Sequence, residues 1–325
     1  MPKVTVIVPV YGVEKYIERC AVSLFEQTLD DIEIIFVNDC TPDRSMEILD
    51  RIIEKYRFLF EEKKYIVRTE SMLTNSGQAA VREHGTKLAI GDYIIHCDSD
   101  DWVEKTWLEL MYEKADNENI DVVFCDYYRV IDNIKVACAN KCDDGCSNDY
   151  YIRRLLTKQC CTSVWNKLVK RGIYQSRDFL YPQCNMWEDY YISTQLFFYA
   201  KKIGYLNRPL YNYFCNRQSI CYASDYEKKI EQVVVNCDGI LSFLKEHNLD
   251  MQYSEEIIVL KNSAKREVLS SFWATDFYRL WKNIYPGIGG KYLLSRIVSL
   301  KDKFQYLIIM LGLYPAWIKL MNRAQ

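Results

Sequence analysis

The first 125 residues alternate short runs of β-branched residues with amphipathic segments, and only a few folds accommodate such a pattern. The β-branched runs predict strands at residues 3–10, 32–39, 63–69, 92–98 and 121–130. The amphipathic segments predict helices at residues 13–27, 45–56, 77–91 and 104–117. Because strands that alternate with helices usually pair in parallel, we expect an α/β fold with a mostly parallel, doubly wound sheet.

The strand pattern stops near residue 222, and the rest of the chain has helical periodicity. A chain of 325 residues is also long for a single core. We therefore expect an α/β domain at residues 1–222 and a helical C-terminal region at residues 223–325. The formal net charge of −2 provides no field for holding a nucleic-acid backbone, so nucleic acid is not an expected partner.

Ligands of doubly wound sheets bind beyond the carboxyl ends of the strands. This rule selects four segments, at residues 9–12, 38–41, 69–77 and 98–101. Neither GxGxxG nor GxxxxGK[ST] is present, which disfavours a dinucleotide or triphosphate held by a glycine loop. A bound nucleotide would then need another source of positive charge, and a divalent cation on carboxylates would supply it.

The segment "DYIIHCDSDDW" (92–102) ends an apolar strand with three carboxylates, Asp98, Asp100 and Asp101. In an extended segment Asp98 and Asp100 share a face, roughly 6 to 7 Å apart at the backbone, and both can bind one hard cation. Asp101 would point the other way and start the next helix. The alternative is a solvated turn in which an aspartate caps a helix starting near Glu104.

Six motifs in order resemble those of the family 2 glycosyltransferases: "VIVPVYG", "IEIIFVNDCTPDRS", "NSGQAAVREHG", "GDYIIHCDSDDW", "VWNKLVKRGIY" and "EDYYIS". The resemblance covers residues 3 to about 220. It implies the GT-A fold, a nucleotide-activated sugar donor and inversion at the anomeric carbon. On this basis we expect a nucleotide-binding half at about residues 1–125 and an acceptor half at about 126–222.

The resemblance also implies a donor site for a sugar nucleotide, with UDP as the expected carrier. Tyr11 and Asp39 would hold the uracil and ribose, and Pro9 and Val10 would shape the floor. Arg217, in the segment "RPLYNYFCNRQSI", would approach the diphosphate. Gly12, Cys40 and Thr41 depart from the usual family residues in the loops around the nucleotide.

Metal and phosphate contacts follow from the same resemblance. Asp98 and Asp100 would form the DxD motif, with Asp98 near the ribose or sugar and both carboxylates available to Mn²⁺ or Mg²⁺. Arg82 matches the family arginine that faces the donor phosphate or sugar. A cation at Asp100 and the guanidinium of Arg82 would stabilise the negative charge that grows on the leaving diphosphate.

The catalytic base is assigned to Asp189 in "WEDYY", with the neighbouring Glu188 as the alternative. A carboxylate within hydrogen-bond reach of an acceptor hydroxyl contributes typically ~10²- to 10⁴-fold to the rate. Apolar neighbours on this aromatic-rich helix would raise the pKa of Asp189. A purely structural alternative is a Glu-Asp pair that is favoured at the start of a helix by its dipole.

Thirteen cysteines occur in a chain whose N-terminus lacks the pattern of a secretory signal. We expect a cytoplasmic protein with free thiols. The cluster Cys138, Cys142 and Cys146 has no CxxC and no nearby histidine, which favours thiols in a loop over a metal site.

The last 40 residues are basic and apolar. The run at 306–318 has 13 residues and contains Gly312 and Pro315, so it is too short and too broken to span a bilayer. Six basic residues flank it: Lys291, Arg296, Lys301, Lys303, Lys319 and Arg323. This composition suits a membrane surface, here the inner face of the cell membrane. The alternative is a helix packed on the α/β domain or on a second subunit of a homodimer.

Together these features predict an inverting, metal-dependent hexosyl- or N-acetylhexosaminyltransferase. Its acceptor would be a glycan or a lipid-linked oligosaccharide in the assembly of a bacterial surface polysaccharide. Two alternatives remain: a phosphatase of the haloacid-dehalogenase type, which also has two carboxylates spaced by one residue after a strand, and a non-catalytic relative that binds glycans or sugar nucleotides.

Overall fold

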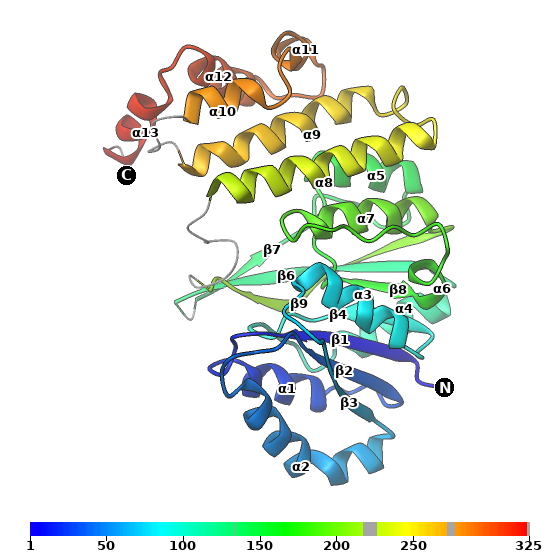
Figure 1. Ribbon diagram of the computed structural model, residues 1–325. Helices are drawn as coiled ribbons and strands as arrows, with labels where there is room; N and C mark the ends of the chain where they lie inside the picture. Colours follow the sequence, from blue (N-terminus) through cyan, green and yellow to red (C-terminus); the bar gives the residue numbers. More distant parts are fainter. Residues whose placement is uncertain (133, 217–225, 272–276, 324–325) are drawn as a thin grey trace. The chain divides into compact units, whose positions relative to one another are not determined.

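The computed structural model describes residues 1–132, 134–216, 226–271 and 277–323 (Figure 1). The chain forms two compact units, Met1–Tyr222 and Ala223–Gln325. All the described strands belong to the first unit, and the described elements of the second unit are helices. The predicted helical C-terminal region is therefore confirmed.

A nine-stranded sheet with the order β3-β2-β1-β4-β8-β6-β9-β5 forms the centre of the first unit, and β7 pairs with β6. The strands are β1 (Val4–Val10), β2 (Ile32–Asn38), β3 (Ile66–Ser71), β4 (Tyr93–His96), β5 (Trp102–Val103), β6 (Val122–Ile131), β7 (Ile134–Cys138), β8 (Lys167–Lys170) and β9 (Ile203–Phe214). β1 to β4 pair only in parallel with one another. β8 is antiparallel to both β4 and β6, so β6 and its parallel partner β9 run in the direction of β1. The α/β fold with a mostly parallel sheet is confirmed.

Helices cover both faces of the parallel strands. The helices of this unit are α1 (Ile17–Phe25), α2 (Ser45–Lys63), α3 (Gln78–Leu88), α4 (Trp107–Asn117), α5 (Asn148–Leu156), α6 (Arg171–Tyr174) and α7 (Glu188–Tyr199). α3 lies against β1, where Gly85 approaches Ile7 so closely that a Cβ would stand 2.5 Å from a methyl carbon of Ile7. This close approach requires glycine at that point of α3.

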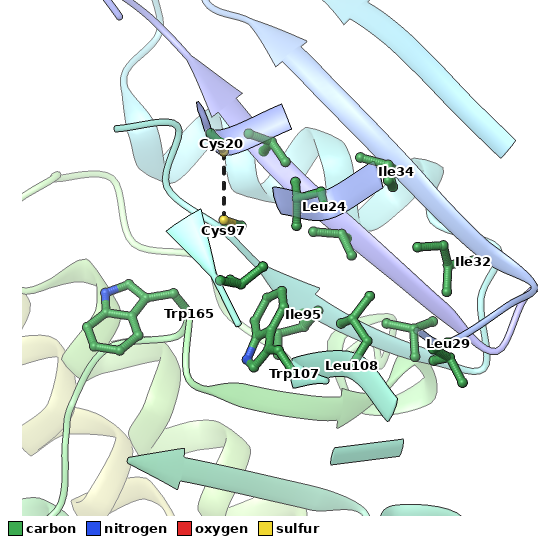
Figure 2. Packing of buried hydrophobic residues seen from close by; sticks show 14 of the residues in the cluster. Cys20, Leu24, Leu29, Ile32, Ile34, Ile95, Cys97, Trp107, Leu108 and Trp165 are labelled. Carbon is green, nitrogen blue, oxygen red and sulfur yellow. Dashed lines mark hydrogen bonds between the residues drawn. The ribbon is translucent and has the colours of Figure 1, made fainter. Parts of the chain in front are cut away.

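The opposite face of the sheet packs on α1, α2 and α4 in one apolar core. Val4, Val6 and Val8 of β1 all point into it, because alternate residues of a strand share a face. Figure 2 shows Leu24 of α1 and Trp107 of α4 among the side chains that meet the strands there. These contacts hold the helices in place, and with them the loops that follow β1, β2 and β4.

The second unit has its own apolar core. Its helices are α8 (Tyr226–Glu246), α9 (Ser254–Glu267), the 3₁₀ turn η2 (Val268–Ser271), α10 (Phe277–Asn283), α11 (Ile288–Leu294), α12 (Leu300–Met310) and α13 (Tyr314–Arg323). Phe277, Trp281, Tyr292 and Tyr306 are buried in this core. None of the helices in the described parts of the chain has both the length and the apolar composition needed to cross a membrane.

Candidate active site

The ends of β1, β2 and β4 lie side by side at one edge of the sheet, with β1 in the middle. The strand order changes direction at β1, and doubly wound sheets bind ligands at such a point. Pro9 and Val10 form the end of β1, and Tyr11 directly after it is 48% exposed. The structure therefore places these three predicted donor residues at the edge where a ligand is expected.

Asp39 follows β2 and is 4% exposed. Its carboxylate accepts hydrogen bonds from the backbone N–H groups of Ser76 (2.7 Å) and Gly77 (2.9 Å). Gly77 has a φ of +84°, a conformation that favours glycine. Asp39 thus anchors the loop between β3 and α3, a structural role that sequence reasoning did not find. Its contact with the donor stays a prediction.

A second set of hydrogen bonds links the loops that follow β1 and β2. The Gly12 N–H donates to the hydroxyl of Thr41 (2.8 Å), which donates to the carboxylate of Asp43 (2.7 Å). Asp43 also accepts the N–H of Glu14 (2.9 Å). Burial raises the pKa of Asp43, but hydrogen bonds from Ser45 and Thr41 outweigh burial and lower it. Two of the departures from the family pattern, Gly12 and Thr41, therefore form this link.

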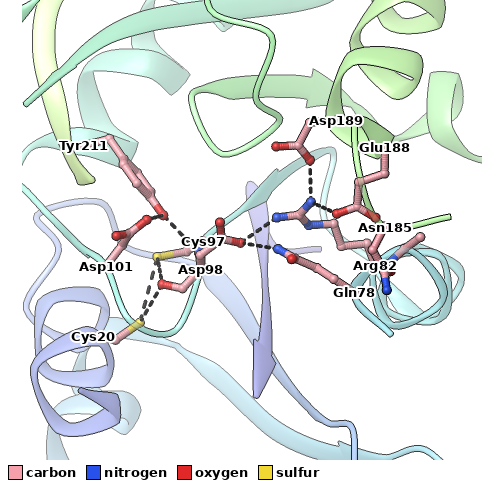
Figure 3. A network of polar contacts seen from close by, with 11 residues as sticks. Cys20, Gln78, Arg82, Cys97, Asp98, Asp101, Asn185, Glu188, Asp189 and Tyr211 are labelled. Carbon is pink, nitrogen blue, oxygen red and sulfur yellow. Dashed lines mark hydrogen bonds and ion pairs between the residues drawn. The ribbon is translucent and has the colours of Figure 1, made fainter. Parts of the chain in front are cut away.

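Arg82 is the centre of the site, and Figure 3 shows its guanidinium among three carboxylates. It projects from α3 and is 1% exposed. One terminal nitrogen donates to Asp98 at 2.5 Å, and the other contacts both Glu188 and Asp189 at the start of α7. Arg82 was expected to face donor phosphate or sugar, but here it joins the DxD segment to the predicted base.

Burial and charge act in opposite directions within this cluster. Burial lowers the pKa of Arg82, but the charges of Asp189, Asp98 and Glu188 outweigh it and raise that pKa. Burial raises the pKa of Glu188 well above its usual value and also raises that of Asp189, while Arg82 opposes both shifts. One cation among three carboxylates leaves an excess of negative charge, and such an excess favours a bound proton or a further cation.

The two candidate bases differ in their access to solvent. The side chain of Asp189 is 23% exposed, whereas that of Glu188 is 4% exposed. The second carboxylate oxygen of Glu188 is buried and has no hydrogen-bond partner. Trp187, directly before α7, has a φ of +65°, which is uncommon for an aromatic residue. The start of α7 therefore presents Asp189, rather than Glu188, to an incoming molecule.

Asp98 and Asp100 have different surroundings within the DxD segment. Asp98 accepts hydrogen bonds from Arg82 and from the Gln78 amide (3.0 Å) on the same oxygen, and its side chain is 20% exposed. The carboxylate of Asp100 accepts from the Asn216 amide (3.0 Å). Burial raises the pKa of Asp100, and the charge of Asp98 adds to this effect.

Asp101 has a role different from the one expected. We predicted that it starts the next helix, but α4 begins only at Trp107, after the short strand β5. Asp101 is fully buried, and its carboxylate accepts hydrogen bonds from the Tyr211 hydroxyl (2.7 Å) and the Phe214 N–H (2.6 Å) of β9. The Tyr211 hydroxyl in turn accepts the N–H of Asp98 (3.0 Å). The prediction for Asp101 is wrong because a distant strand, rather than the local helix, satisfies its charge.

Three residues of this network were not found from the sequence: Gln78, Asn185 and Tyr211. The amide oxygen of Asn185 accepts the N–H of Ala79 (3.2 Å) at the start of α3, next to Gly77. Asn185 thereby connects the loop before α7 to the helix that carries Arg82. A single amide in a loop, such as Asn185, carries no periodic signal, so only the folded arrangement identifies it.

The described residues contain no group of three or more His, Cys, Asp or Glu side chains that could hold a metal ion, and this includes Cys138, Cys142 and Cys146. Asp98 and Asp100 offer two carboxylates on one short segment, which fits a cation that takes its other ligands from water and phosphate. Arg217 lies outside the described residues, so its predicted contact with the diphosphate has no structural description.

Comparisons with known proteins agree with this architecture. The family model described as "Glycosyl transferase family 2" matches residues 5–176. The protein EpsH of Bacillus subtilis is 31% identical over 273 residues, which cover 81% of this chain and 76% of EpsH.

Two solved structures have the same fold. TarS 1-349 of S. aureus in complex with UDP-GlcNAc is 20% identical, with a TM-score of 0.68 over 99% of this chain and 92% of that chain. The mannosyltransferase PcManGT of Pyrobaculum calidifontis, in complex with GDP-Man and Mn²⁺, is 14% identical, with a TM-score of 0.56 over 96% of this chain and 87% of that chain.

The fold and the comparisons define a glycosyltransferase with the GT-A fold. More specifically, the chain belongs to glycosyl transferase family 2, as the six sequence motifs indicated. Because the chain belongs to this family, the alternative of a phosphatase of the haloacid-dehalogenase type is dropped.

Proposed function

We propose that this protein is an inverting, metal-dependent transferase that moves a hexosyl or N-acetylhexosaminyl group from a UDP-sugar to a glycan or lipid-linked oligosaccharide. The assembly of a bacterial surface polysaccharide is the process that we assign to it. The observation that carries the proposal is the Arg82 cluster, in which one buried guanidinium joins the DxD residue Asp98 to the candidate base Asp189.

The donor would bind at the carboxyl ends of β1 and β2. Tyr11 is exposed there and available to stack on a flat base. Pro9 and Val10 would form the floor of the donor site. The loop that Asp39 anchors would border the ribose. UDP as the carrier is supported by the similarity to TarS, which has been solved with UDP-GlcNAc. In this proposal residues 1–125 bind the nucleotide and residues 126–222 bind the acceptor.

Asp98 and Asp100 would hold Mn²⁺ or Mg²⁺. Both carboxylates are hard oxygen ligands, and neither is fully buried. A bound cation would supply electrostatic stabilisation to the leaving diphosphate. The complex of PcManGT with Mn²⁺ supports a metal at this fold.

Asp189 would remove the proton from the acceptor hydroxyl. It is the more exposed member of the Glu188–Asp189 pair, and burial shifts its pKa upward, towards that of a better proton acceptor. Arg82 would act as a positioning residue, because its two terminal nitrogens contact carboxylates and orient Asp189 and Asp98 relative to each other. Glu188 is the alternative base.

Replacement of Asp189 by Asn tests the proposal. We expect donor-dependent release of UDP to fall by ~10²- to 10⁴-fold. Thermal stabilisation by UDP and Mn²⁺ should be unchanged, because the donor site is intact. Normal transfer by this variant would falsify the base assignment. A wild-type protein that binds UDP-sugars but transfers to none of a panel of glycan and lipid-linked acceptors would favour the non-catalytic alternative.

We further propose that the protein works in the cytoplasm, at the inner face of the cell membrane, where lipid-linked acceptors are found. A homodimer is the competing explanation for the apolar C-terminal segment. The two proposals require different surfaces on the helical unit. Membrane contact requires an apolar face that is free, whereas a homodimer requires an apolar face that is complementary to itself.

A further inference from the structure

Helix α12 presents a row of apolar side chains to solvent. The row consists of Leu300, Phe304, Leu307 and Leu311, which are 85%, 61%, 41% and 71% exposed. Their spacing of four, three and four residues places them along one side of α12 and its C-terminal cap. We refer to these four residues as the α12 stripe.

The other side of α12 is already used for packing. Tyr306 and Ile309 are buried in the core of the helical unit. A helix on the surface of a globular protein usually turns polar residues outward, whereas α12 is apolar both toward the core and along its exposed stripe. Further apolar residues close by in the sequence are also exposed: Leu294 (84%), Ile297 (46%), Leu313 (52%) and Leu320 (66%).

The surrounding charge is strongly positive. Residues 277–320 contain seven basic residues and one acidic residue, Asp302; the basic residues are Arg279, Lys282, Lys291, Arg296, Lys301, Lys303 and Lys319. Asp302 pairs with Arg266 of α9 (3.5 Å), which offsets its charge within the unit. By helical spacing, Lys301 and Lys303 flank the α12 stripe on its two sides. The whole chain, in contrast, has a net charge of −2.

We propose that the α12 stripe and its flanking basic residues bind the surface of an anionic lipid bilayer. The helix would lie in the plane of the interface, with the stripe among the acyl chains and the ammonium groups at the lipid phosphates. The charge selects this occupant, because a second copy of the same surface would bring positive charge against positive charge. This inference rests on the membrane location proposed above, names the surface that makes the contact, and is tested without donor or acceptor, so its failure would leave the proposed transfer reaction untouched.

The experiment uses the full chain and two kinds of vesicle, one of phosphatidylcholine alone and one with phosphatidylglycerol added. We expect the protein to sediment with the anionic vesicles and to remain in the supernatant with the neutral ones. Raising the salt towards ~1 M, where the Debye length is about 3 Å, should weaken the binding. Equal binding to both vesicles would overturn the role of charge, and with it the proposal.

Two kinds of variant separate the apolar and the electrostatic contributions to vesicle binding. Phe304→Ser should lower the partition coefficient about tenfold or more, because a phenyl ring no longer enters the bilayer. Lys301→Gln should lower it about fivefold. Phe58→Ser and Lys55→Gln, at exposed positions of α2 in the first unit, are the matched controls and should bind as the wild type does. Circular dichroism of each variant establishes that it is folded.

Three further results would contradict the proposal. If folded Phe304→Ser sediments with anionic vesicles as the wild type does, the α12 stripe does not contact the bilayer. If the wild-type protein is a dimer that does not bind vesicles, and Phe304→Ser converts it to a monomer, the α12 stripe belongs to a subunit interface. If the wild-type protein is a monomer and binds neither kind of vesicle, the lipid proposal is wrong. A negatively charged protein would then be the partner of the α12 stripe.

Discussion

The two units each contain a deeply buried cation, and the two cations are satisfied in opposite ways. Arg82 in the first unit contacts three carboxylates, Asp98, Glu188 and Asp189. Lys265 in the second unit is 2% exposed and donates hydrogen bonds to the backbone carbonyls of Trp281 (2.6 Å) and Ile284 (2.5 Å). Both side chains lose their hydration, but among the residues that the structure describes only Arg82 gains opposite charge in return.

The difference separates a structural cation from one at a reactive site. Lys265 caps the carbonyl end of α10, where the helix dipole favours a positive charge, and no other molecule is needed to complete that arrangement. Burial lowers the pKa of Lys265 to about 8. Around Arg82 the carboxylates outnumber the cation, so the cluster can still accept a proton or sit beside a metal. Excess charge of this kind distinguishes a functional network from a buried ion pair.

Removing Arg82 should have the largest effect. In Arg82→Met, three carboxylates lose their partner, and we expect the first unit to lose about 3–5 kcal/mol of stability. Hydrogen exchange of the α3 and α7 amides measures this loss locally. Transfer should be lost as well, because Asp189 and Asp98 are no longer held together.

Arg82→Lys is the informative companion to this variant. It keeps the charge, but a single ammonium cannot reproduce the fork that reaches Asp98 with one nitrogen and the two α7 carboxylates with the other. We expect stability to recover in part while kcat stays low. Full recovery of kcat would show that charge alone matters and that the guanidinium does not position the base.

Because Lys265 is buried, we expect the stability of the second unit to depend on pH. Its pKa is about 8 in the folded protein and 10.5 in its unperturbed state, so the unfolded chain binds more protons between these values. Stability should therefore rise with pH, by about 1–2 kcal/mol between pH 8 and 9.5. Urea unfolding followed by hydrogen exchange of α10 would measure it. Lys265→Met should lack this rise, and an equal rise in the variant would attribute it to another group.

Much of the fold could be predicted because it depends on local periodicity. The alternation of strands and helices through residue 130 specifies β1 to β4 and their parallel pairing. The insertion of β8 between β4 and β6 was not predicted, since "KLVK" is only four residues long and strand order depends on contacts far away in the sequence. Segment ends were also shifted: α2 extends to Lys63, so β3 starts at Ile66 rather than at residue 63.

The candidate site was predictable in its residue types but not in its connections. Arg82 and Asp189 are 107 residues apart, and no pattern in either segment indicates that they touch. Asp39 could be identified as a carboxylate at a strand end, but not as the anchor for Ser76 and Gly77. Asp101 was misassigned for the same reason. Local rules place a side chain at an edge of the sheet, whereas its partners are decided by packing.

Glu188→Gln should have the smallest effect on transfer. It removes one of the three carboxylates around Arg82, and so tests how much of the excess negative charge that distinguishes Arg82 from Lys265 is needed for activity. Glu188 is nearly as buried as Arg82, and burial raises its pKa well above its usual value, so the amide resembles the protonated acid in charge and shape. We expect kcat to change by less than about tenfold, against the ~10²- to 10⁴-fold loss expected for Asp189→Asn. Both variants should bind UDP equally, which the thermal shift with UDP and Mn²⁺ would check. If Glu188→Gln instead loses transfer while Asp189→Asn keeps it, the base is Glu188, and the more exposed carboxylate of Asp189 serves only to orient Arg82.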